Sequence, residues 1–505
     1  MLLIYPPVAR PSEPPAGIAR LSGALTHYGV AHRLLDANLE GLLYLVEESD
    51  VPQKRDRWTA RAWRNRTANI GALRSREITA SFDRYKRVVS DISRALATAT
   101  TEFGAVGLAN YKQQGLSPVR SSDLVAAAEN PQGNPFYPYF SVRLTGLLDE
   151  SQPSAIGFSL NYLSQALCTF AMIGFLRKAC PEVKIVLGGG LVTSWVKRLQ
   201  GRNPFRGLVD HLVAGPGEDP LLSLCGIDSA AQTHFTPVYH GLPLRDYLSP
   251  GTILPYSASQ GCYWRRCSFC PEKAEGNPYI PLPADRARED LQKTSERIRP
   301  DLIHLLDNAV SVQLMTALAE RPLGVPWHGF ARIDRSLADP RFCAALKRSG
   351  CAVLNLGLES GDQEVLDRLE KGIRLETASL ALRELKKAGI ATYVYLMFGT
   401  PPETPASARR TLEFIVRHQE EVGFLNLALF NMPICGPETG ELETSRFYEG
   451  DLSLYTDFSH PDGWGRRQVR DFLENEFKKH RAVSAILRRD PPVFTSSHAP
   501  FFAMT

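Results

Sequence analysis

The sequence has no hydrophobic run long enough to cross a membrane, and its excess of positive charge is small. A transmembrane helix needs about 20 consecutive apolar residues, and the apolar run at the N-terminus ends at Pro6, too early for a secretory signal. The formal net charge is +4 over 505 residues, which gives no basis for electrostatic binding of nucleic acid. We therefore predict a cytoplasmic protein with neither membrane nor nucleic-acid partners.

The nine cysteines lack the regular pattern of a disulfide framework, which is typical of short secreted chains. Six of them stand apart without ligand spacing, and we predict that they are small buried apolar residues. These are Cys168, Cys180, Cys225, Cys343, Cys351 and Cys435.

The other three cysteines, Cys262, Cys267 and Cys270, lie within nine residues. Three thiolates on one loop can hold three corners of a [4Fe–4S] cluster, and no fourth Cys or His follows nearby to close the site. A structural zinc site needs four ligands, and a c-type haem site needs a His where this chain has Pro271. The spacing favours a cluster with one open iron that can bind a small molecule, with zinc and chance as the alternatives.

The chain after this loop alternates strands with helices. Apolar runs near residues 302, 327, 353 and 393 predict buried strands, and the segments 337–348, 377–388 and 406–420 have helical periodicity. This pattern predicts a parallel sheet, here a partial (β/α) barrel.

Polar residues follow these predicted strands at the ends where barrel enzymes carry their active sites. A single acid in such a place is more often a helix cap than a ligand, but several in register with the cysteine loop indicate a binding site. The candidates are Asp307, Asn308, Arg332, Glu359 and Ser360.

The first part of the chain contains a second series of α/β units. Strands are predicted near residues 2–5, 32–36, 155–159, 183–188 and 211–214, with a mainly helical insertion at about 42–150. Such a doubly wound, Rossmann-like domain binds ligands at the carboxyl ends of its strands. Glycines there are also ordinary turn residues, and without a following Lys-Ser/Thr they form no P-loop. The candidates are Asp36, Asn38, Ser159, Gly188, Gly189, Gly190, Gly215 and Glu218.

The sequence thus predicts an α/β protein of three parts. These are a doubly wound domain over 1–235, a partial barrel over 250–430 and a C-terminal extension over 431–505.

The second part resembles the radical S-adenosylmethionine (radical SAM) enzymes. The resemblance rests on the cysteine loop with Phe269 before its last cysteine, on Gly357-Leu-Glu359-Ser360, on Lys371-Gly372 and on Gly399-Thr-Pro-Pro-Glu403-Thr. The common signature of that family has three residues between the first two cysteines, whereas this chain has four. The resemblance implies that SAM binds the open iron and is cleaved reductively to a 5′-deoxyadenosyl radical, with a reductant such as flavodoxin or ferredoxin and a small-molecule substrate.

The same resemblance implies roles for individual residues. Glu359 would hydrogen-bond the ribose of SAM, and Arg332 would meet its carboxylate or an acid of the substrate. Asp307 and Asn308 would lie near the methionyl amine, while Phe269 and Ser360 belong to the same cofactor site.

The first domain resembles the cobalamin-binding domain that precedes many radical SAM domains. Such domains carry Asp-x-His-x-x-Gly, in which the His binds cobalt, whereas this chain has Asp36-Ala-Asn38-Leu-Glu-Gly41. The resemblance implies a cobalamin whose lower face has no histidine ligand. It also implies that the Gly188–Gly190 turn admits the nucleotide tail, while the segment from Gly215 to Glu218 lines the same edge.

Together the two resemblances imply cobalamin-dependent methylation of an unactivated carbon. Two alternatives remain open from the sequence. One is a radical SAM rearrangement, ring formation or SAM-fragment transfer without cobalamin. The other is a non-catalytic iron–sulfur protein that transfers electrons or senses redox state.

Overall fold

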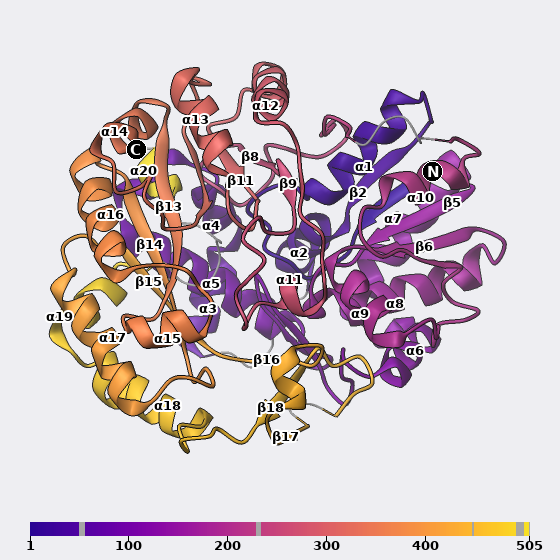
Figure 1. Cartoon of the computed structure of the whole chain (residues 1–505). Helices are drawn as coiled ribbons and strands as arrows, with labels where there is room; N and C mark the ends of the chain where they lie inside the picture. Colours follow the sequence, from indigo (N-terminus) through magenta and orange to yellow (C-terminus); the bar gives the residue numbers. More distant parts are fainter. Residues whose placement is uncertain (50–55, 229–233, 447–448, 491–498, 504–505) are drawn as a thin grey trace. The chain divides into compact units, whose positions relative to one another are not determined.

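The chain forms two compact units in the computed structural model, which describes residues 1–49, 56–228, 234–446, 449–490 and 499–503 (Figure 1). The first unit comprises Met1–Ile253 with Glu449–Ser453, and the second holds the other described residues. None of the described helices combines the length and the apolar character that a membrane span requires.

The first unit is built on a parallel sheet of five strands in the order β2-β1-β5-β6-β7. The chain runs from β1 to β2 in one direction and from β5 to β7 in the other, so the carboxyl ends of β1 and β5 flank a topological switch point. Helices α1 and α10 lie on one face of the sheet, and α8 and α9 on the other (Figure 1). The strands are β1 (Leu2–Tyr5), β2 (Arg33–Asp36), β5 (Ala155–Ser159), β6 (Lys184–Gly188) and β7 (His211–Leu212), and the helices are α1 (Ala16–His27), α8 (Leu163–Ala179), α9 (Gly190–Leu199) and α10 (Glu218–Leu224).

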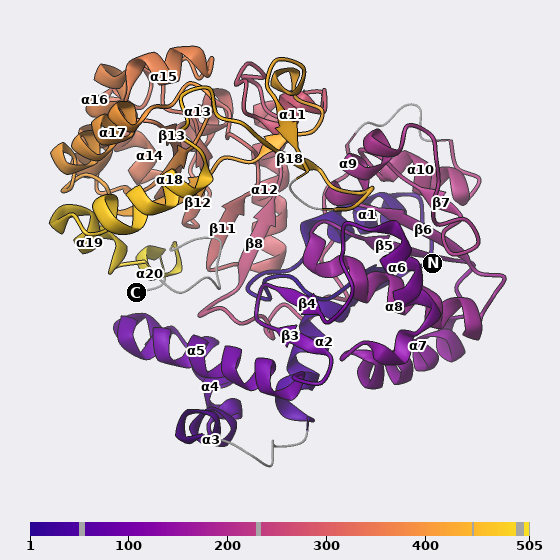
Figure 2. The same cartoon turned by 90° about the horizontal axis from the view of Figure 1, so that it is seen from below.

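The insertion between β2 and β5 is helical for most of its length. Helices α3, α4 and α5 pack together as a group (Figure 2). The expectation of a helical insertion missed one feature, an antiparallel pair of short strands in which Gly104 adopts φ +148°. Residues 50–55 of the insertion lie outside the described residues. Its elements are α2 (Ala37–Glu47), α3 (Arg57–Arg64), α4 (Arg66–Leu73), α5 (Phe82–Ala99), β3 (Gly104–Val106), β4 (Tyr111–Gln113), α6 (Ser121–Glu129) and α7 (Tyr137–Ser151).

The second unit is built on a sheet of six strands in the order β15-β14-β13-β12-β11-β8. From β11 to β15 each strand pairs in parallel with the next one along the chain, as expected of a partial barrel. The strands are β8 (Ile253–Tyr256), β11 (Leu302–Leu305), β12 (Trp327–Ala331), β13 (Cys351–Glu359), β14 (Ala391–Phe398) and β15 (Phe424–Leu429), and the intervening helices are α12 (Ala284–Ile298), α13 (Val312–Glu320), α14 (Pro340–Arg348), α15 (Gln363–Arg368), α16 (Leu375–Ala388) and α17 (Pro405–Arg417).

Burial alternates along β14, where Thr392, Val394, Leu396 and Phe398 are buried and the residues between them are half-buried. A strand with this period has one fully covered face. The predicted fold class, two successive parallel α/β sheets, is confirmed.

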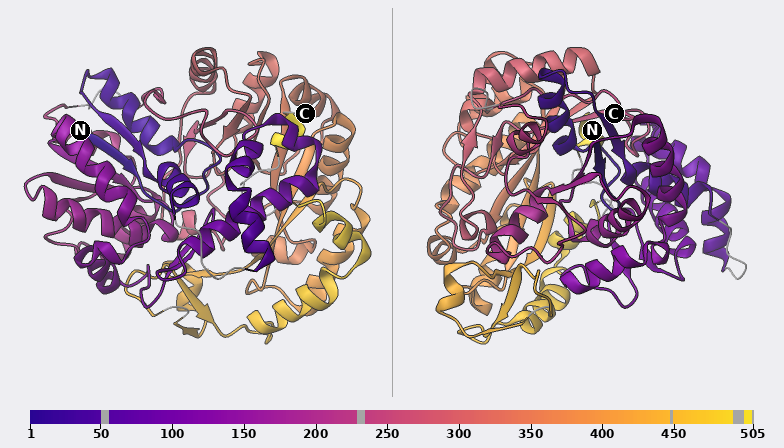
Figure 3. Two further views of the ribbon diagram at one scale, coloured as in Figure 1. Left: turned by 180° about the vertical axis from the view of Figure 1, so that it is seen from behind. Right: turned by 90° about the vertical axis from the view of Figure 1, so that its right-hand side faces the viewer.

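The described part of the C-terminal region contains a small antiparallel sheet and further helices. Helix α19 packs against α17 and β15. In Figure 3 the C-terminal segment, coloured yellow, runs beside the orange helices of the second unit. Residues 491–498 and 504–505 of the expected extension lie outside the described residues. The elements are β16 (Met432–Pro433), β17 (Thr444–Ser445), β18 (Tyr455–Phe458), α18 (Arg466–Phe472), α19 (Arg481–Leu487) and α20 (Pro500–Ala503).

Candidate functional site

The three clustered cysteines lie on the loop between β9 (Ser259–Gln260) and α11 (Pro271–Ala274), and each is partly exposed. Cys270 is the N-cap residue of α11, and its side chain accepts no capping hydrogen bond. Burial raises the pKa of the Cys270 thiol to about 11, and burial also raises the pKa of Cys267. Metal binding must therefore displace protons from these thiols.

Within the described chain, no three or more His, Cys, Asp or Glu side chains converge closely enough to hold a single metal ion. The prediction that the other cysteines are buried is wrong for Cys435, which is exposed, and Cys180 and Cys225 are only half-buried.

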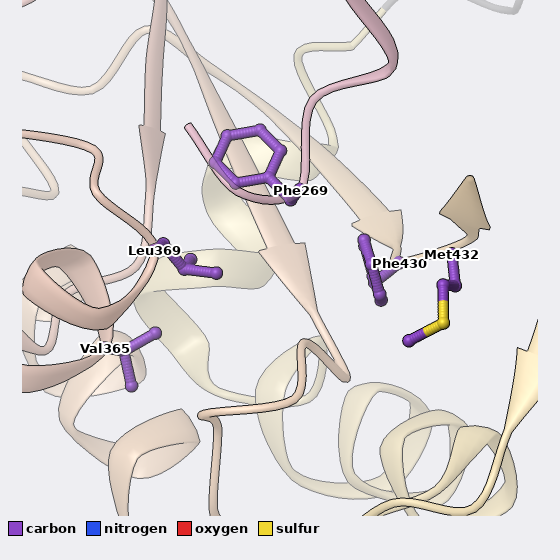
Figure 4. Packing of buried hydrophobic residues seen from close by; sticks show 5 residues of the cluster. All are labelled: Phe269, Val365, Leu369, Phe430 and Met432. Atoms are coloured by element: carbon purple, nitrogen blue, oxygen red, sulfur yellow. The ribbon is translucent and has the colours of Figure 1, made fainter. Parts of the chain in front are cut away.

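Phe269 fixes the loop to the barrel. Its ring packs in a buried apolar cluster with Val365, Leu369, Phe430 and Met432 (Figure 4). The side chains of Cys267 and Cys270 lie against this cluster. The aromatic residue before the last cysteine thus has a packing role that locates two of the three thiols.

The loop also rests on residues 369–372, which follow α15. The backbone N–H of Ser268 donates to the Leu369 carbonyl at 3.0 Å, and Trp264 Nε1 donates to the Glu370 carbonyl at 2.9 Å. Lys273 Nζ lies 2.7 Å from Glu370 Oε2. The Lys371-Gly372 element of the sequence therefore lies directly beneath the cysteine loop.

Glu359 lies at the end of β13 in the left-handed region, with φ +70°. Its side chain is buried and accepts a hydrogen bond from Lys371 Nζ at 2.8 Å. Non-glycine residues in this conformation concentrate at functional sites. Ser360 points elsewhere: its hydroxyl lies 3.2 Å from Thr411 Oγ1 on α17, so it fixes the strand to a helix.

Arg332 follows β12 and is 9 % exposed. Its guanidinium lies 3.7 Å from the centroid of the Trp264 ring, and it donates a hydrogen bond to the Lys371 carbonyl. Burial lowers the pKa of Arg332. The loop, the strand end and residues 371–372 thus bring Arg332, Glu359 and the cysteines into one region.

Asp307 and Asn308 are placed differently from each other. Asp307 is buried, and its carboxylate accepts from the Ala258 backbone N–H at 3.1 Å and from the Ser259 hydroxyl. Burial raises its pKa. Asn308 is exposed. Asp307 therefore organises the β8–β9 corner that leads into the cysteine loop, and its expected position near a methionyl amine stays a prediction.

Sequence reasoning missed the part that Trp264 plays. The available signal was the extra residue between Cys262 and Cys267, which changes the course of the loop. Lys371 belongs to the Lys371-Gly372 motif, but its ion pair with Glu359 depends on a contact between a strand and a loop that residue spacing in the sequence does not reveal.

In the first unit, Ser159 and the glycines 188–190 come together where β5 and β6 end. Asn161 Nδ2 donates to Ser159 Oγ at 3.1 Å, and the N–H of Gly190 donates to Asn161 Oδ1 at 2.9 Å. Gly189 has φ +110°, and a Cβ there would lie 2.4 Å from the Leu160 carbonyl oxygen. Gly189 is therefore required by the packing of β5 against β6, with or without a ligand.

The other predicted residues of this unit make internal contacts. The Asp36 carboxylate caps α2 through the Leu39 N–H at 2.9 Å and accepts from the Tyr247 hydroxyl at 2.7 Å, while burial raises its pKa to about 6. Asn38 is buried, and its Oδ1 accepts from the Ala9 N–H at 2.7 Å. Asn38 therefore offers no lone-pair nitrogen to a cobalt ion.

The last two candidates of the unit lie near β7. The N–H of Gly215 donates to Thr193 Oγ1 of α9 at 2.9 Å, and Glu218, buried at the start of α10, forms an ion pair with Arg20 of α1.

Comparison with known proteins identifies the second unit. Residues 256–415 match the Radical SAM superfamily, a segment that contains the cysteine loop, Arg332, Glu359 and Lys371. Residues 256–415 are a radical SAM domain.

Two curated relatives align beyond the radical SAM domain. The bacteriochlorophyllide d C-12(1)-methyltransferase of Chlorobaculum tepidum is 26 % identical over 251 residues, which are 47 % of this chain and 53 % of that protein. The hopanoid C-3 methylase of Methylococcus capsulatus is 25 % identical over 347 residues, 62 % of this chain and 65 % of that protein. The chain thus matches between about half and two thirds of the length of these relatives.

A solved structure shares the fold of both units. The radical S-adenosylmethionine methyltransferase TsrM from Kitasatospora setae, solved with cobalamin and a [4Fe–4S] cluster, aligns with a TM-score of 0.51 at 16 % identity. The alignment covers 87 % of this chain and 77 % of TsrM, so it includes the five-stranded unit as well as the radical SAM domain.

Proposed function

We propose that this chain is a cobalamin-dependent radical SAM methyltransferase that methylates an unactivated carbon of a small molecule. The observation that carries the proposal is the convergence of the three cysteines with Arg332, Glu359 and Lys371 in a radical SAM domain that follows a doubly wound domain. Both relatives named above are methylating enzymes by name.

Cys262, Cys267 and Cys270 fit a [4Fe–4S] cluster. They are three thiols on one loop, and the side chains of Cys267 and Cys270 lie against a buried apolar cluster. When bound, the cluster and cobalamin supply the electron that cleaves SAM and the methyl group that is transferred. The residues of the chain bind SAM, orient it and exclude water.

Glu359 and Arg332 are proposed to bind SAM at the rim of the barrel. The Glu359 carboxylate can accept hydrogen bonds from ribose hydroxyls with its other oxygen, since Oε1 is shared with Lys371. Arg332 presents a guanidinium to the methionyl carboxylate. Asp307 is proposed to support the loop rather than to touch the amine, because its hydrogen bonds go to Ala258 and Ser259.

Cobalamin is proposed to bind the first unit at the ends of β5 and β6. A Cβ at Gly188 or Gly190 would make only ordinary contacts of 3.6 Å or more, so backbone at these positions is open to approach by a nucleotide tail. Asn38 would not supply a ligand to the cobalt, because its side-chain oxygen accepts a hydrogen bond from the Ala9 N–H. A reductant such as flavodoxin or ferredoxin would deliver the electron.

The alternative of radical chemistry without cobalamin keeps one observation in its favour. Asp36, Asn38 and Glu218, three of the residues expected at the corrinoid, all have their side chains engaged within the unit. Only binding and product analysis decide between the two.

The test uses the whole chain, purified without oxygen and reconstituted with iron, sulfide and, in parallel, with or without hydroxocobalamin. With dithionite, SAM bearing a deuterated methyl group, and bacteriochlorophyllide d or a hopanoid as first substrates, we expect 5′-deoxyadenosine and S-adenosylhomocysteine, and a deuterated product only with cobalamin. Formation of 5′-deoxyadenosine with no bound cobalamin would favour the cobalamin-free alternative. Absence of SAM cleavage by a fully loaded cluster would support the electron-transfer alternative.

Single Cys→Ala variants test the cluster itself. Loss of any of Cys262, Cys267 or Cys270 should remove the brown chromophore and most of the iron. Cys435→Ala is the matched control, because Cys435 is exposed and lies outside the loop. Full iron content in all three variants would overturn the cluster assignment.

A further inference from the structure

Arg332 is a buried cation without a carboxylate partner in the described part of the second unit. It is 9 % exposed, and its guanidinium donates a hydrogen bond to the Lys371 carbonyl. The neighbouring acid Asp334 instead accepts from the Ser336 N–H at 2.9 Å. A buried charge without an ion pair is costly. Cys267 and Asp334 interact with Arg332 only electrostatically, so the guanidinium is available to an anionic ligand.

The face of Arg332 is covered by Trp264. The centroid of the indole ring lies 3.7 Å from the guanidinium carbon, and the ring is fixed at its edge by the hydrogen bond from Nε1 to the Glu370 carbonyl. Arg266, which is exposed, lies farther from the same ring, at 5.2 Å. The planar guanidinium on an aromatic face is the geometry of a cation–π pair, which also restricts the rotation of the arginine.

The long cysteine loop makes this contact possible. Four residues separate Cys262 from Cys267, and Arg265, which follows Trp264, adopts the left-handed conformation with φ +50°. The opposite side of the contact requires a glycine, because a Cβ on Gly372 (φ +64°) would lie 2.2 Å from Trp264 Cζ2 and 3.0 Å from an Arg332 nitrogen. The left-handed turn at Arg265, the Trp264 indole and Gly372 therefore together determine the surroundings of Arg332.

We propose that Trp264 is a positioning residue that holds the Arg332 guanidinium to receive the carboxylate of SAM. The inference rests on the proposed function, because it names how this chain recognises one group of that cofactor. One guanidinium nitrogen is occupied by the Lys371 carbonyl, and the remaining N–H groups of the fork are left for a carboxylate. Covering by the indole lowers the local dielectric, which strengthens the attraction between guanidinium and carboxylate.

The experiment compares SAM with decarboxylated SAM, which lacks only the carboxylate. Each ligand is titrated into the reduced, fully loaded protein, and its dissociation constant is read from the change in the EPR spectrum of the cluster. The variants are Trp264→Leu, Trp264→Phe, Arg332→Gln and the double variant Trp264→Leu/Arg332→Gln. Arg266→Ala is the matched control, because it removes the more distant cation from the same ring. Iron content is measured for every variant.

We expect Trp264→Leu to weaken SAM binding about three- to thirtyfold, the range that a partly desolvated cation–π pair supports. Binding of decarboxylated SAM should stay within about twofold of wild type, and so should SAM binding by Arg266→Ala. Trp264→Phe, which keeps a ring but loses the Nε1 bond, should lie between wild type and Trp264→Leu. In the Arg332→Gln background, Trp264→Leu should have no further effect.

Equal weakening of both ligands by Trp264→Leu, or unchanged SAM binding with an intact cluster, would overturn the inference. So would an Arg332→Gln variant that binds SAM as wild type does. If Trp264→Leu loses iron, Trp264→Phe takes its place, and a smaller selective loss for SAM is expected. Failure of the proposed function looks different, because SAM would then leave the spectrum of the wild-type cluster unchanged.

Discussion

Glu359 and Lys371 form a buried ion pair, with 2.8 Å between Oε1 and Nζ. Their side chains are 10 % and 11 % exposed, and Lys371 Nζ also lies 5.5 Å from the centroid of the Phe269 ring. The pair joins the end of β13 to the loop on which the cysteines rest. It therefore couples the proposed ribose-binding carboxylate to the position of the proposed cluster ligands.

Removing one partner of this pair should destabilise the fold, because the other charge stays buried without compensation. We expect Lys371→Met to lower the free energy of unfolding by about 3 kcal/mol. The double variant Lys371→Met/Glu359→Gln should recover part of that loss, since neither buried charge remains. Urea denaturation of the anaerobic protein measures both, and equal stability of wild type and Lys371→Met would contradict the role given to the pair.

Arg265 is a non-glycine residue in the left-handed region, between two proposed cluster ligands. Arg265→Gly should keep the cluster and raise the thermal unfolding midpoint slightly, because glycine adopts this conformation without strain. Arg265→Val should lower the midpoint and the iron content, since a β-branched residue strongly disfavours positive φ. If the two variants had the same unfolding midpoint and iron content, the left-handed conformation at Arg265 would not constrain the loop.

The order of the strands and the residues at their ends were predictable from the sequence. Apolar runs near 302, 327, 353 and 393 ending in polar groups led to β11–β14 and to Asp307, Arg332 and Glu359, because strand period and burial are local properties of the chain. The three cysteines could equally be recognised from the sequence as candidate ligands, because they lie within nine residues of one another.

The partners of these residues were not predictable, because each arises from a contact between distant segments. Lys371 reaches Glu359 only when α15 returns the chain beneath β13, and Trp264 meets Arg332 only across the barrel rim. In the sequence, Asn38 stands where the related motif has the cobalt-binding His. Its hydrogen bond from the Ala9 N–H could not be predicted, because it forms only when β1 and β2 are paired. The β3–β4 pair was missed because its strands have only three residues each, too few for a period-two pattern.

Glycines 189 and 190 should respond differently to substitution. A Cβ on Gly189 would collide with the Leu160 backbone, whereas one on Gly190 would meet only Asn161 Oδ1 at 3.7 Å. Gly189→Ala should therefore destabilise the first unit by about 2 kcal/mol or more even without cobalamin, through the clash and the positive φ. Gly190→Ala should fold normally and is the appropriate variant for cobalamin titration by absorbance. A fully stable Gly189→Ala protein would show that the turn is looser than its geometry implies.

Asn38→Ala should cost stability rather than a cobalt ligand. The Ala9 N–H would lose its acceptor in a buried position, which is worth about 1–3 kcal/mol. Thermal unfolding of the cobalamin-free protein measures this cost, with Asn38→Asp as the control that retains an acceptor. The EPR spectrum of bound cob(II)alamin should show no hyperfine coupling to a protein nitrogen in wild type. Observation of such coupling would mean that a histidine elsewhere in the chain binds the cobalt.

Glu403 should make the stability of the second unit depend on pH. Its carboxylate is buried and accepts hydrogen bonds from the Gly399 N–H and from Trp464 Nε1, and burial raises its pKa from 4.5 to about 7. Between these two values the folded state binds more protons than the unfolded state, so stability falls as the pH rises from about 4.5 to 7. Above pH 7 the buried, ionised carboxylate lowers the free energy of unfolding by its full amount, on the order of 3 kcal/mol, and below pH 4.5 this loss vanishes. Glu403→Gln stays neutral and keeps an oxygen for both donors, so its advantage over wild type in free energy of unfolding should grow across this range. Glu376→Gln, a change at an exposed side chain, should run parallel to wild type in the same denaturant series. Parallel curves for Glu403→Gln as well would show that the buried carboxylate is already ionised at low pH.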